Sequence, residues 1–242
     1  MFKFYEVGGK VRDEILGLHN KDIDYVAVPS DLSSVQGVGQ LFWILGEYLR
    51  EQGYQIFLET PECFTIRAKF PKGHKNDGMT ADFVLARKEI GYVEGTRNPI
   101  IVAGDLYDDL RRRDFTVNAM AKDENGGIID FFNGQKHLKQ RVLKTPIKGE
   151  VTFGDDPLRL LRAIRFAVTK GMMIDVEIDV ILHTFDYQAK FGVVSEERIR
   201  EELYKAFKHN TVMTMNMLFN YQGLMKYIFK NTKLWLKPTN EN

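Results

Sequence analysis

Two aspartates near the start of the chain, Asp22 and Asp24, have the spacing that metal-dependent chemistry requires. They flank the first residue of a strand predicted over Ile23–Val28, and side chains two residues apart on a strand point to the same face. Two neighbouring carboxylates repel each other unless a cation lies between them, and oxygen ligands beside phosphates suit Mg²⁺. Such sites transfer phosphoryl groups, often with a third carboxylate. Asp82, on a strand predicted over Thr80–Ala86, is the best candidate for it.

A glycine pair ahead of these aspartates is suited to holding phosphate. Gly8 and Gly9 permit a tight turn and a close approach of the backbone to a ligand. The helix predicted over Val11–Gly17 would present its free N–H groups and positive end to an anion, and Arg12 in its first turn can pair with phosphate oxygens. Glycine pairs and Asp-x-Asp pairs are each common in ordinary turns and surfaces. The prediction therefore depends on their conjunction with two further motifs.

Three consecutive arginines form the first of these motifs, in Leu110-Arg111-Arg112-Arg113-Asp114-Phe115-Thr116-Val117-Asn118-Ala119. The alternative interpretation, without any ligand, is the solvated end of a helix, predicted over Asp105–Arg113, followed by an ordinary strand. Packing three guanidinium groups without anions would be costly. We therefore interpret the motif as a segment that binds phosphate or ribose and continues into a strand after Asp114.

A second charged motif, with the sequence DDPLRLLRAIRF, covers residues 155–166. Pro157 stands in the first turn of a predicted helix, where proline is tolerated. Asp156, Arg159, Arg162 and Arg165 are spaced by three residues and share one helix face. A surface helix with internal salt bridges would alternate its charge signs. A row of three arginines would instead repel itself without an anion, which favours a bound nucleotide.

The elements that must position these side chains change character along the chain. The first part mixes strands and helices, whereas the sequence after Gly134 is almost wholly helical. Besides the elements already described, we predict strands over Phe4–Val7, Gln55–Leu58 and Phe64–Phe70, and helices over Ser33–Gln52, Val176–Phe185, Ser195–Lys208 and Thr211–Tyr221. We expect an α+β fold with a catalytic head at residues 1–135, a helical neck at 136–208 and a short, basic helical region at 209–242.

The bulk composition limits the classes of function. The chain has 242 residues and a formal net charge of +1, so any RNA contact must use local patches rather than global charge. No Cys/His cluster has zinc spacing, and we expect the single cysteine, Cys63, to be a buried thiol. The longest apolar stretch, Leu41–Leu45, is far too short to span a bilayer, and residues 1–6 lack the apolar region that a signal peptide would show. We therefore expect a cytoplasmic protein without membrane contact.

Taken in chain order, the motifs resemble the signatures of one family, the class II CCA-adding tRNA nucleotidyltransferases and their bacterial poly(A) polymerase relatives. Residues 8–13 with Asp22 and Asp24 resemble the first signature, and residues 112–119 resemble the second. Residues 155–159 resemble the nucleotide-selecting signature, with Asp155 in place of the family's glutamate. Further matches lie in a strand, a hinge-like segment and a neck helix: Asp82, Ala86, Arg87 and Glu89; Gly126, Gly127, Asp130 and Gly134; Ser195, Glu197, Arg198 and Ile199.

The resemblance implies a fold, a cofactor and a role for each motif. The fold is a five-stranded, palm-like nucleotidyltransferase sheet of the DNA polymerase β type, followed by helical neck and body regions. Mg²⁺ would be bound by Asp22 and Asp24, with Asp82 as a third catalytic carboxylate. The nucleotide would be bound by the glycine turn, several arginines and one acid: Gly8, Gly9, Arg12, Arg113, Asp156, Arg159, Arg162 and Arg165.

Asp156 and Arg159 suggest how the base is chosen. A carboxylate accepts hydrogen bonds and a guanidinium donates them. Adenine and cytosine both place an exocyclic amine beside a ring-nitrogen acceptor, which matches this pair, whereas guanine and uracil present the reverse pattern. Each buried group left unpaired costs roughly 1–3 kcal/mol. Our hypothesis is that this side-chain pair replaces a nucleic-acid template.

The leading hypothesis is a Mg²⁺-dependent enzyme that adds or repairs the 3′-terminal CCA of tRNA from CTP and ATP and releases pyrophosphate. Poly(A) addition, or addition of only C or only A, remain open because these activities share the site motifs. A non-catalytic RNA-binding module is a further alternative. The retention of Asp22, Asp24 and Arg113 argues against it, since a pure binder gains nothing from paired metal carboxylates. The sequence gives no indication of the oligomeric state.

Overall fold

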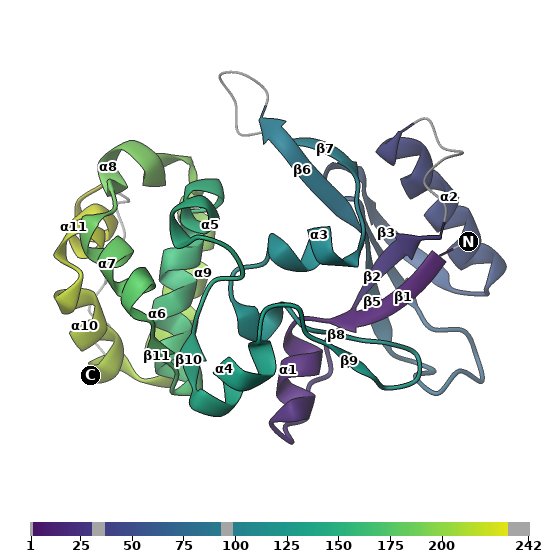
Figure 1. The fold of residues 1–242 in the computed structure, drawn as a ribbon, viewed down its shortest axis with the longest axis horizontal. Coiled ribbons are helices and arrows are strands. Elements are labelled where there is room, and N and C mark those ends of the chain that lie inside the picture. Colours follow the sequence, from purple (N-terminus) through teal and green to yellow (C-terminus); the bar gives the residue numbers. More distant parts are fainter. Residues whose placement is uncertain (1, 31–36, 93–98, 232–242) are drawn as a thin grey trace, which may run out of the picture. The chain divides into compact units, whose positions relative to one another are not determined.

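The computed structural model describes residues 2–30, 37–92 and 99–231. The chain forms two compact units, Met1–Gln135 and Lys136–Asn242, called the head and the helical unit from here on. Figure 1 shows that the head combines a sheet with helices, whereas the second unit is mostly helical, so the fold is α+β as predicted. In the described part of the chain, no helix is long and apolar enough to cross a membrane.

The head is built on a mixed sheet with the strand order β3-β4-β5-β2-β1-β8-β9. Only β2 and β5 pair in parallel, and the other neighbours are antiparallel. The sheet strands are β1 (Phe2–Val7), β2 (Ile23–Pro29), β3 (Gln55–Thr60), β4 (Thr65–Lys69), β5 (Thr80–Leu85), β8 (Ala121–Lys122) and β9 (Ile128–Ile129). The resemblance implied five strands. The five long strands are present, and the two-residue strands β8 and β9 extend the sheet beyond β1.

Three helices and a hairpin complete the head: α1 (Gly9–Ile15), α2 (Val38–Glu51), α3 (Leu106–Arg111) and the strands β6 (Arg87–Tyr92) and β7 (Pro99–Ala103). The helix predicted over Ser33–Gln52 is found as α2, and its predicted start at Ser33 lies outside the described residues. The β6–β7 hairpin was not predicted and projects from the main sheet (Figure 1).

The two faces of the sheet carry different cores. One core packs α2, through residues such as Leu45 and Leu49, against alternate strand residues such as Ile23 and Phe83. The other packs α3, through Leu106 and Leu110, against the residues of opposite parity such as Val26. Because side chains alternate along a strand, this arrangement assigns Asp24 and Asp82 to the α3 face.

Two local predictions for the head are wrong. Residues after Asp114 form the 3₁₀ turn η2 (Thr116–Asn118) instead of a strand, because the Asp114 side chain accepts from the backbone N–H of Phe115 and from the Asn118 amide. Such local side-chain bonds compete with a sheet ladder. Cys63 is exposed rather than buried, since it ends the 3₁₀ turn η1 (Pro61–Cys63).

The hinge-like segment predicted from sequence depends on one acid and one glycine. Asp130 accepts from the backbone N–H groups of Gly134 and Gln135, at 2.7 and 2.9 Å, at the start of α4 (Gly134–Gln140). A Cβ atom on Gly134 would lie 2.3 Å from the carbonyl oxygen of Thr116 and 2.7 Å from Cγ of Met120. Gly134 therefore allows its backbone to lie close to Thr116 and Met120, and any larger residue would block this approach.

A Gly134→Ala substitution is expected to lower the free energy of unfolding by about 3 kcal/mol, because the added methyl group overpacks a fixed backbone contact. Urea denaturation measures the loss. Gly154→Ala is the matched control, since Gly154 lies in a helix and a Cβ there would meet nothing within 4 Å. That control should gain roughly 0.5–1 kcal/mol. Equal midpoints for the two variants would contradict the close approach.

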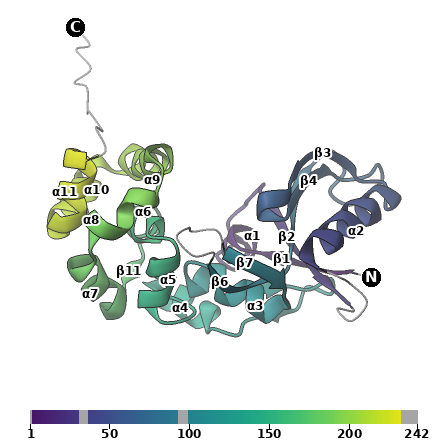
Figure 2. The same cartoon turned by 90° about the horizontal axis from the view of Figure 1, so that it is seen from above.

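Three helices of the helical unit pack against one another. α6 (Leu158–Lys170) and α9 (Glu196–His209) contact each other along their lengths, and α10 (Thr211–Asn220) contacts both, as Figure 2 shows. The remaining elements are α5 (Gly149–Asp155), α7 (Val176–Thr184), α8 (Tyr187–Lys190), η3 (Phe191–Val193), α11 (Gln222–Asn231) and the paired strands β10 (Val142–Leu143) and β11 (Met173–Ile174).

Sequence signals set the ends of these helices. Pro157 stands at the N-cap of α6, and Gly171 ends that helix with φ 62°. Ser195 caps α9 by accepting from the backbone N–H of Arg198. The predicted helices of this region are thus present, and the short β10–β11 pair is the departure from an all-helical region.

Candidate active site

Three neighbouring strands bring two acids and one arginine into a row on the α3 face of the head. In the parallel pair β2–β5, Asp24 lies opposite Asp82. In the antiparallel pair β4–β5, Arg67 lies opposite Asp82. The row therefore runs Asp24, Asp82, Arg67 across the sheet, and strand pairing fixes its order.

An open cavity of about 410 Å³ lies along this row. Asp22 and Asp24 both line it, with Asp22 exposed just before β2 and Asp24 half-buried on the strand. The rest of the lining comes from Lys21, Ile23, Arg67, Thr80, Ala81 and Asp82. The two aspartates with the predicted metal spacing thus face one solvent-accessible space.

Asp82 is engaged by an arginine. Arg67 donates from Nε to Oδ1 and from Nη2 to Oδ2 of Asp82, each at 2.6 Å. Among the residues that the structure describes, no group of three or more His, Cys, Asp and Glu side chains converges to hold a metal ion. The structure therefore shows an ion pair at the position expected for the third carboxylate.

The electrostatics of Asp24 favour a bound cation. Burial raises the pKa of the Asp24 carboxyl above its usual value, and the Asp82 and Asp22 carboxylates raise it further against the opposing effect of Arg113 and Arg67. A divalent cation at Asp22 and Asp24 would cancel this repulsion, and carboxylate oxygens are the ligands that Mg²⁺ takes. The donor set therefore fits a hard divalent ion.

The glycine turn lies against both the acids and the arginine motif. Gly8 has φ 71°, in the left-handed region that glycine adopts without strain. A Cβ atom on Gly8 would lie 3.2 Å from Nη1 of Arg113 and 3.8 Å from Oδ2 of Asp24. Gly8 thus brings the glycine–aspartate motif (residues 8–24) next to the arginine motif (residues 110–119), a proximity that spacing in the sequence does not reveal.

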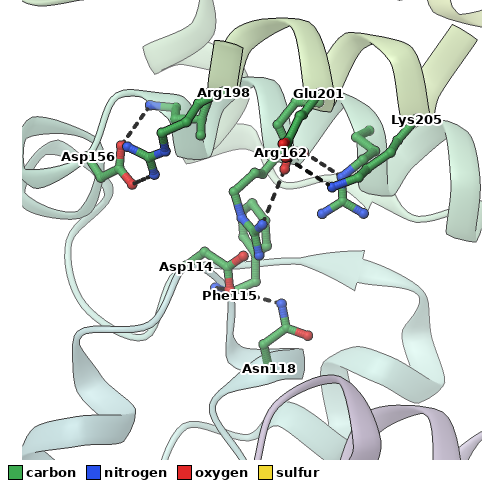
Figure 3. A network of polar contacts seen from close by, with 11 residues as sticks. Asp114, Phe115, Asn118, Asp156, Arg162, Arg198, Glu201 and Lys205 are labelled. Carbon is green, nitrogen blue, oxygen red and sulfur yellow. Dashed lines mark hydrogen bonds and ion pairs between the residues drawn. The ribbon is translucent and has the colours of Figure 1, made fainter. Parts of the chain in front are cut away.

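Arg12 joins the same two motifs from inside the head. It is buried, and donates from Nε to Oδ1 of Asp13 at 2.8 Å and from Nη1 to Oδ1 of Asn118 at 2.6 Å. Asn118 in turn donates to Oδ1 of Asp114 at 2.9 Å, a contact drawn in Figure 3. In this structure Arg12 connects α1 to the 3₁₀ turn; its predicted triphosphate contact stays a prediction.

Asn20 is a residue that sequence reasoning missed. Its amide donates to Oδ2 of Asp13 at 2.9 Å, and its Oδ1 accepts from the backbone N–H of Asp22 at 3.0 Å. Lys10 donates to the Asn20 carbonyl at 3.1 Å. The loop that carries Asp22 is therefore tied to the glycine-turn helix α1.

Asp109 is the second residue that was missed, and it corrects the inference from the three arginines. Its carboxylate is fully buried and accepts from Arg112 through Oδ1 and from Arg113 through Oδ2. Burial alone would raise the pKa of the Asp109 carboxyl, but the two guanidinium groups outweigh burial and hold it below its usual value. The arginines therefore need no external anion in order to pack, and Asp109 fixes Arg113 beside Gly8.

In the helical unit, Asp156 and Arg159 are positioned by neighbouring elements. Asp156 accepts from Arg198 of α9 at 2.9 Å (Figure 3) and from the backbone N–H of Leu158 at 3.2 Å. Arg159 donates from Nη1 to the carbonyl of Thr152 in α5 at 3.1 Å. Both side chains are half-buried, so each keeps part of its surface open to solvent.

Glu202 pairs with two of the arginines on α6, Arg162 and Arg165. This buried residue of α9 contacts Arg162 at 3.4 Å and Arg165 at 2.5 Å. The guanidinium of Arg165 also lies 4.6 Å from the ring centroid of Phe166. The expectation that the row would repel itself without a bound anion is therefore wrong, because the chain supplies the anion. The predicted nucleotide contacts of Arg162 and Arg165 stay predictions.

Comparison with known sequences decides the family. The sequence model of the poly(A) polymerase head domain matches residues 4–144, which is more than half of the chain. The chain belongs to the poly(A) polymerase head domain family. The matched region contains the candidate site residues of the head, from Gly8 to Asn118, whereas Asp156 and Arg159 follow its end.

Similar proteins include CCA-adding enzymes and a tRNA nucleotidyltransferase. The chain is 30% identical to the CCA-adding enzyme of Staphylococcus aureus (strain MRSA252), over 95% of this chain and 54% of the relative. A tRNA nucleotidyltransferase solved with a primer tRNA and an incoming ATP analogue is 27% identical, with a TM-score of 0.70 over 95% of this chain and 60% of that one. A CCA-adding enzyme solved with CTP is 28% identical, with a TM-score of 0.71 over 98% and 49% of the two chains. This member of the poly(A) polymerase head domain family thus spans about half the length of the curated relatives it matches.

Proposed function

We propose that the chain is a Mg²⁺-dependent, template-free RNA nucleotidyltransferase that adds or repairs the 3′-terminal CCA of tRNA, using CTP and ATP. The observation that carries the proposal is the placement of Asp24 beside Gly8, Arg113 and the Asp22-lined cavity. Similar structures support the choice of substrates, since they include a CCA-adding enzyme solved with CTP and a tRNA nucleotidyltransferase solved with a primer tRNA and an ATP analogue. A cytoplasmic location is part of this proposal.

Asp22 and Asp24 are the residues that would hold Mg²⁺ in this site. When bound, the ion neutralises charge on the attacking 3′-hydroxyl and on the pyrophosphate that leaves. The chain contributes the geometry around it. The Gly8 turn lets the triphosphate approach the backbone, and Arg113, held by Asp109, presents a guanidinium to the phosphates. The RNA 3′-oxygen would bond to the α-phosphorus as the bond between the α-phosphorus and the pyrophosphate oxygen breaks, and the proton of the 3′-hydroxyl would pass to water in the open cavity.

Asp156 and Arg159 are proposed to read the base. The Asp156 carboxylate accepts from the exocyclic amine of cytosine or adenine, and the Arg159 guanidinium donates to the ring nitrogen. Arg198 and the Thr152 carbonyl hold the two side chains in place. Guanine and uracil would set donor against donor and acceptor against acceptor.

An Arg159→Ala variant is expected to lose discrimination between CTP and UTP by about tenfold or more, since one unpaired hydrogen-bonding group costs about 1–3 kcal/mol. Incorporation of each labelled nucleotide, offered singly, measures kcat/KM for the four bases. Arg200→Ala is the control, because Arg200 is an exposed arginine of α9 that pairs with Glu196. Full preference for C and A in Arg159→Ala would contradict the base-reading role.

One assay tests the proposed function as a whole. The protein and Mg²⁺ are incubated with tRNAs that end before, within and after CCA, and each labelled nucleotide is offered separately. Addition that stops after the final A supports the proposal. Long A-tails would assign poly(A) addition, and addition of C alone or A alone a partial activity. RNA binding without any incorporation would assign a binding module and overturn the proposal.

A further inference from the structure

The ion pair between Arg67 and Asp82 is part of the sheet and not a chance surface contact. The two residues are direct partners across the antiparallel β4–β5 pair, where opposite charges stabilise each other. The arginine fork uses two parallel bonds of 2.6 Å, one to each carboxylate oxygen. Bidentate pairs of this kind are among the strongest charge-assisted hydrogen bonds.

We propose that Arg67 is a positioning residue of the metal site: it holds both oxygens of Asp82, keeps that carboxylate out of metal coordination, and leaves Asp22 and Asp24 as the two ion ligands. This inference rests on the proposed function, because it takes Asp22 and Asp24 as the residues that bind the divalent ion. It gives Asp82, the predicted third catalytic carboxylate, a place beside the ion site but outside the metal ligands.

The geometry makes Asp82 a poor metal ligand while Arg67 is present. For Asp82 to coordinate an ion beside Asp24, at least one of the two Arg67 bonds has to break. The released guanidinium would then lie next to a divalent cation, and two positive charges in such close proximity repel each other strongly.

Arg67 also sets the charge of the cavity. The side chain is 49% exposed and lines the cavity together with Asp22 and Asp24. Paired with Asp82, it forms a neutral unit, so the negative charge that an ion meets in the cavity comes from Asp22 and Asp24, against the positive charge of Lys21. Removing Arg67 alone would add a third free carboxylate and raise the affinity for the bare metal ion.

The proposal is tested by measuring Mn²⁺ binding to the full chain without RNA or nucleotide. The electron paramagnetic resonance signal of the free ion reports how much Mn²⁺ is unbound. Arg67→Gln is expected to bind Mn²⁺ about tenfold more tightly than the wild type, because one more carboxylate joins the ligands. The charge-neutral double variant Arg67→Gln/Asp82→Asn is expected to bind within about twofold of the wild type, since both ligands remain. Arg50→Gln is the matched control: Arg50 is 47% exposed and pairs with Glu47 and Glu59 on α2 and β3.

The outcomes separate this inference from the proposed function. A roughly tenfold loss of affinity in Arg67→Gln/Asp82→Asn would show that Asp82 is a ligand and overturn the inference. An unchanged affinity in Arg67→Gln would overturn it as well. Asp24→Asn must weaken Mn²⁺ binding; if it does not, the metal site itself is misplaced and the proposed function fails. If Arg67→Gln unfolds, the double variant still decides, because it retains no unpaired charge.

Discussion

Asp24→Asn is expected to reduce nucleotide incorporation by about a thousandfold, the scale of losing one electrostatic group from a preorganised site. Asp24 is the acid that lies both beside the Gly8 turn and opposite Asp82 on the sheet. The amide keeps the shape of the side chain but removes the charge that would hold the divalent ion. The loss is expected in kcat, because the ion acts on the reacting oxygens.

The same variant is expected to fold at least as stably as the wild type. Burial raises the pKa of the Asp24 carboxyl, and Asp82 and Asp22 add to this effect, so the charged form is held at a net disadvantage despite Arg113 and Arg67. A neutral amide removes that disadvantage. Active sites often sacrifice stability in this way for their chemistry.

Two measurements check this prediction together. Incorporation of labelled CTP into a tRNA acceptor reports the activity, and urea denaturation reports the free energy of unfolding. Glu51→Gln, an exposed charge at the end of α2, should change neither. Asp24→Asn with more than about a tenth of wild-type activity would contradict a metal-binding role, since such a role predicts a far larger loss.

Local signals predicted the acids and the turn well. The spacing of Asp22 and Asp24, and the period of two along β2 and β5, are properties of a single strand, so they appear in the sequence. The glycine pair is an equally local signal, because the positive φ of Gly8 is a conformation that glycine itself allows. The helix starts at Pro157 and Ser195 follow from capping preferences of the same kind.

Partners from other elements were harder to predict. Glu202 lies 40 residues from Arg162 in the sequence, and only the packing of α6 on α9 brings the two side chains together. The one available signal was a glutamate on the apolar face of α9, which also carries Ile199, Leu203 and Ala206. Arg67 carried no signal, since its role depends on the register between β4 and β5.

Asp109 is a partner that the sequence itself signals. It precedes Arg112 by three residues and Arg113 by four, which is the spacing of ion pairs along one helix face. The interpretation of the three arginines as a phosphate-binding cluster leaves out this acid in the preceding turn of the helix. The structure shows that an arginine-rich motif has to be balanced against nearby acids before an external anion is inferred.

Asp109→Asn is therefore expected to lower the free energy of unfolding at neutral pH by about 3–5 kcal/mol, the cost of removing one partner from a buried ion pair. Asp109 is fully buried, and its loss leaves Arg112 and Arg113 without the carboxylate that both contact. Arg113 would also lose its fixed position beside Gly8. The variant is thus expected to raise the KM for nucleotide as well.

The pH dependence distinguishes this mechanism from a simple packing defect. The native pKa of Asp109 is lowered, so its contribution to stability is complete above the unfolded-state pKa of about 3.9 and is lost as the pH falls through the lower native value. The difference in unfolding free energy between wild type and Asp109→Asn should therefore shrink in strong acid. Asp105→Asn, at the N-cap of the same helix, should stay within about 0.5 kcal/mol of the wild type, because asparagine caps as well as aspartate. A difference for Asp109→Asn that stays constant down to pH 2 would mean that shape, and not charge, makes this position essential.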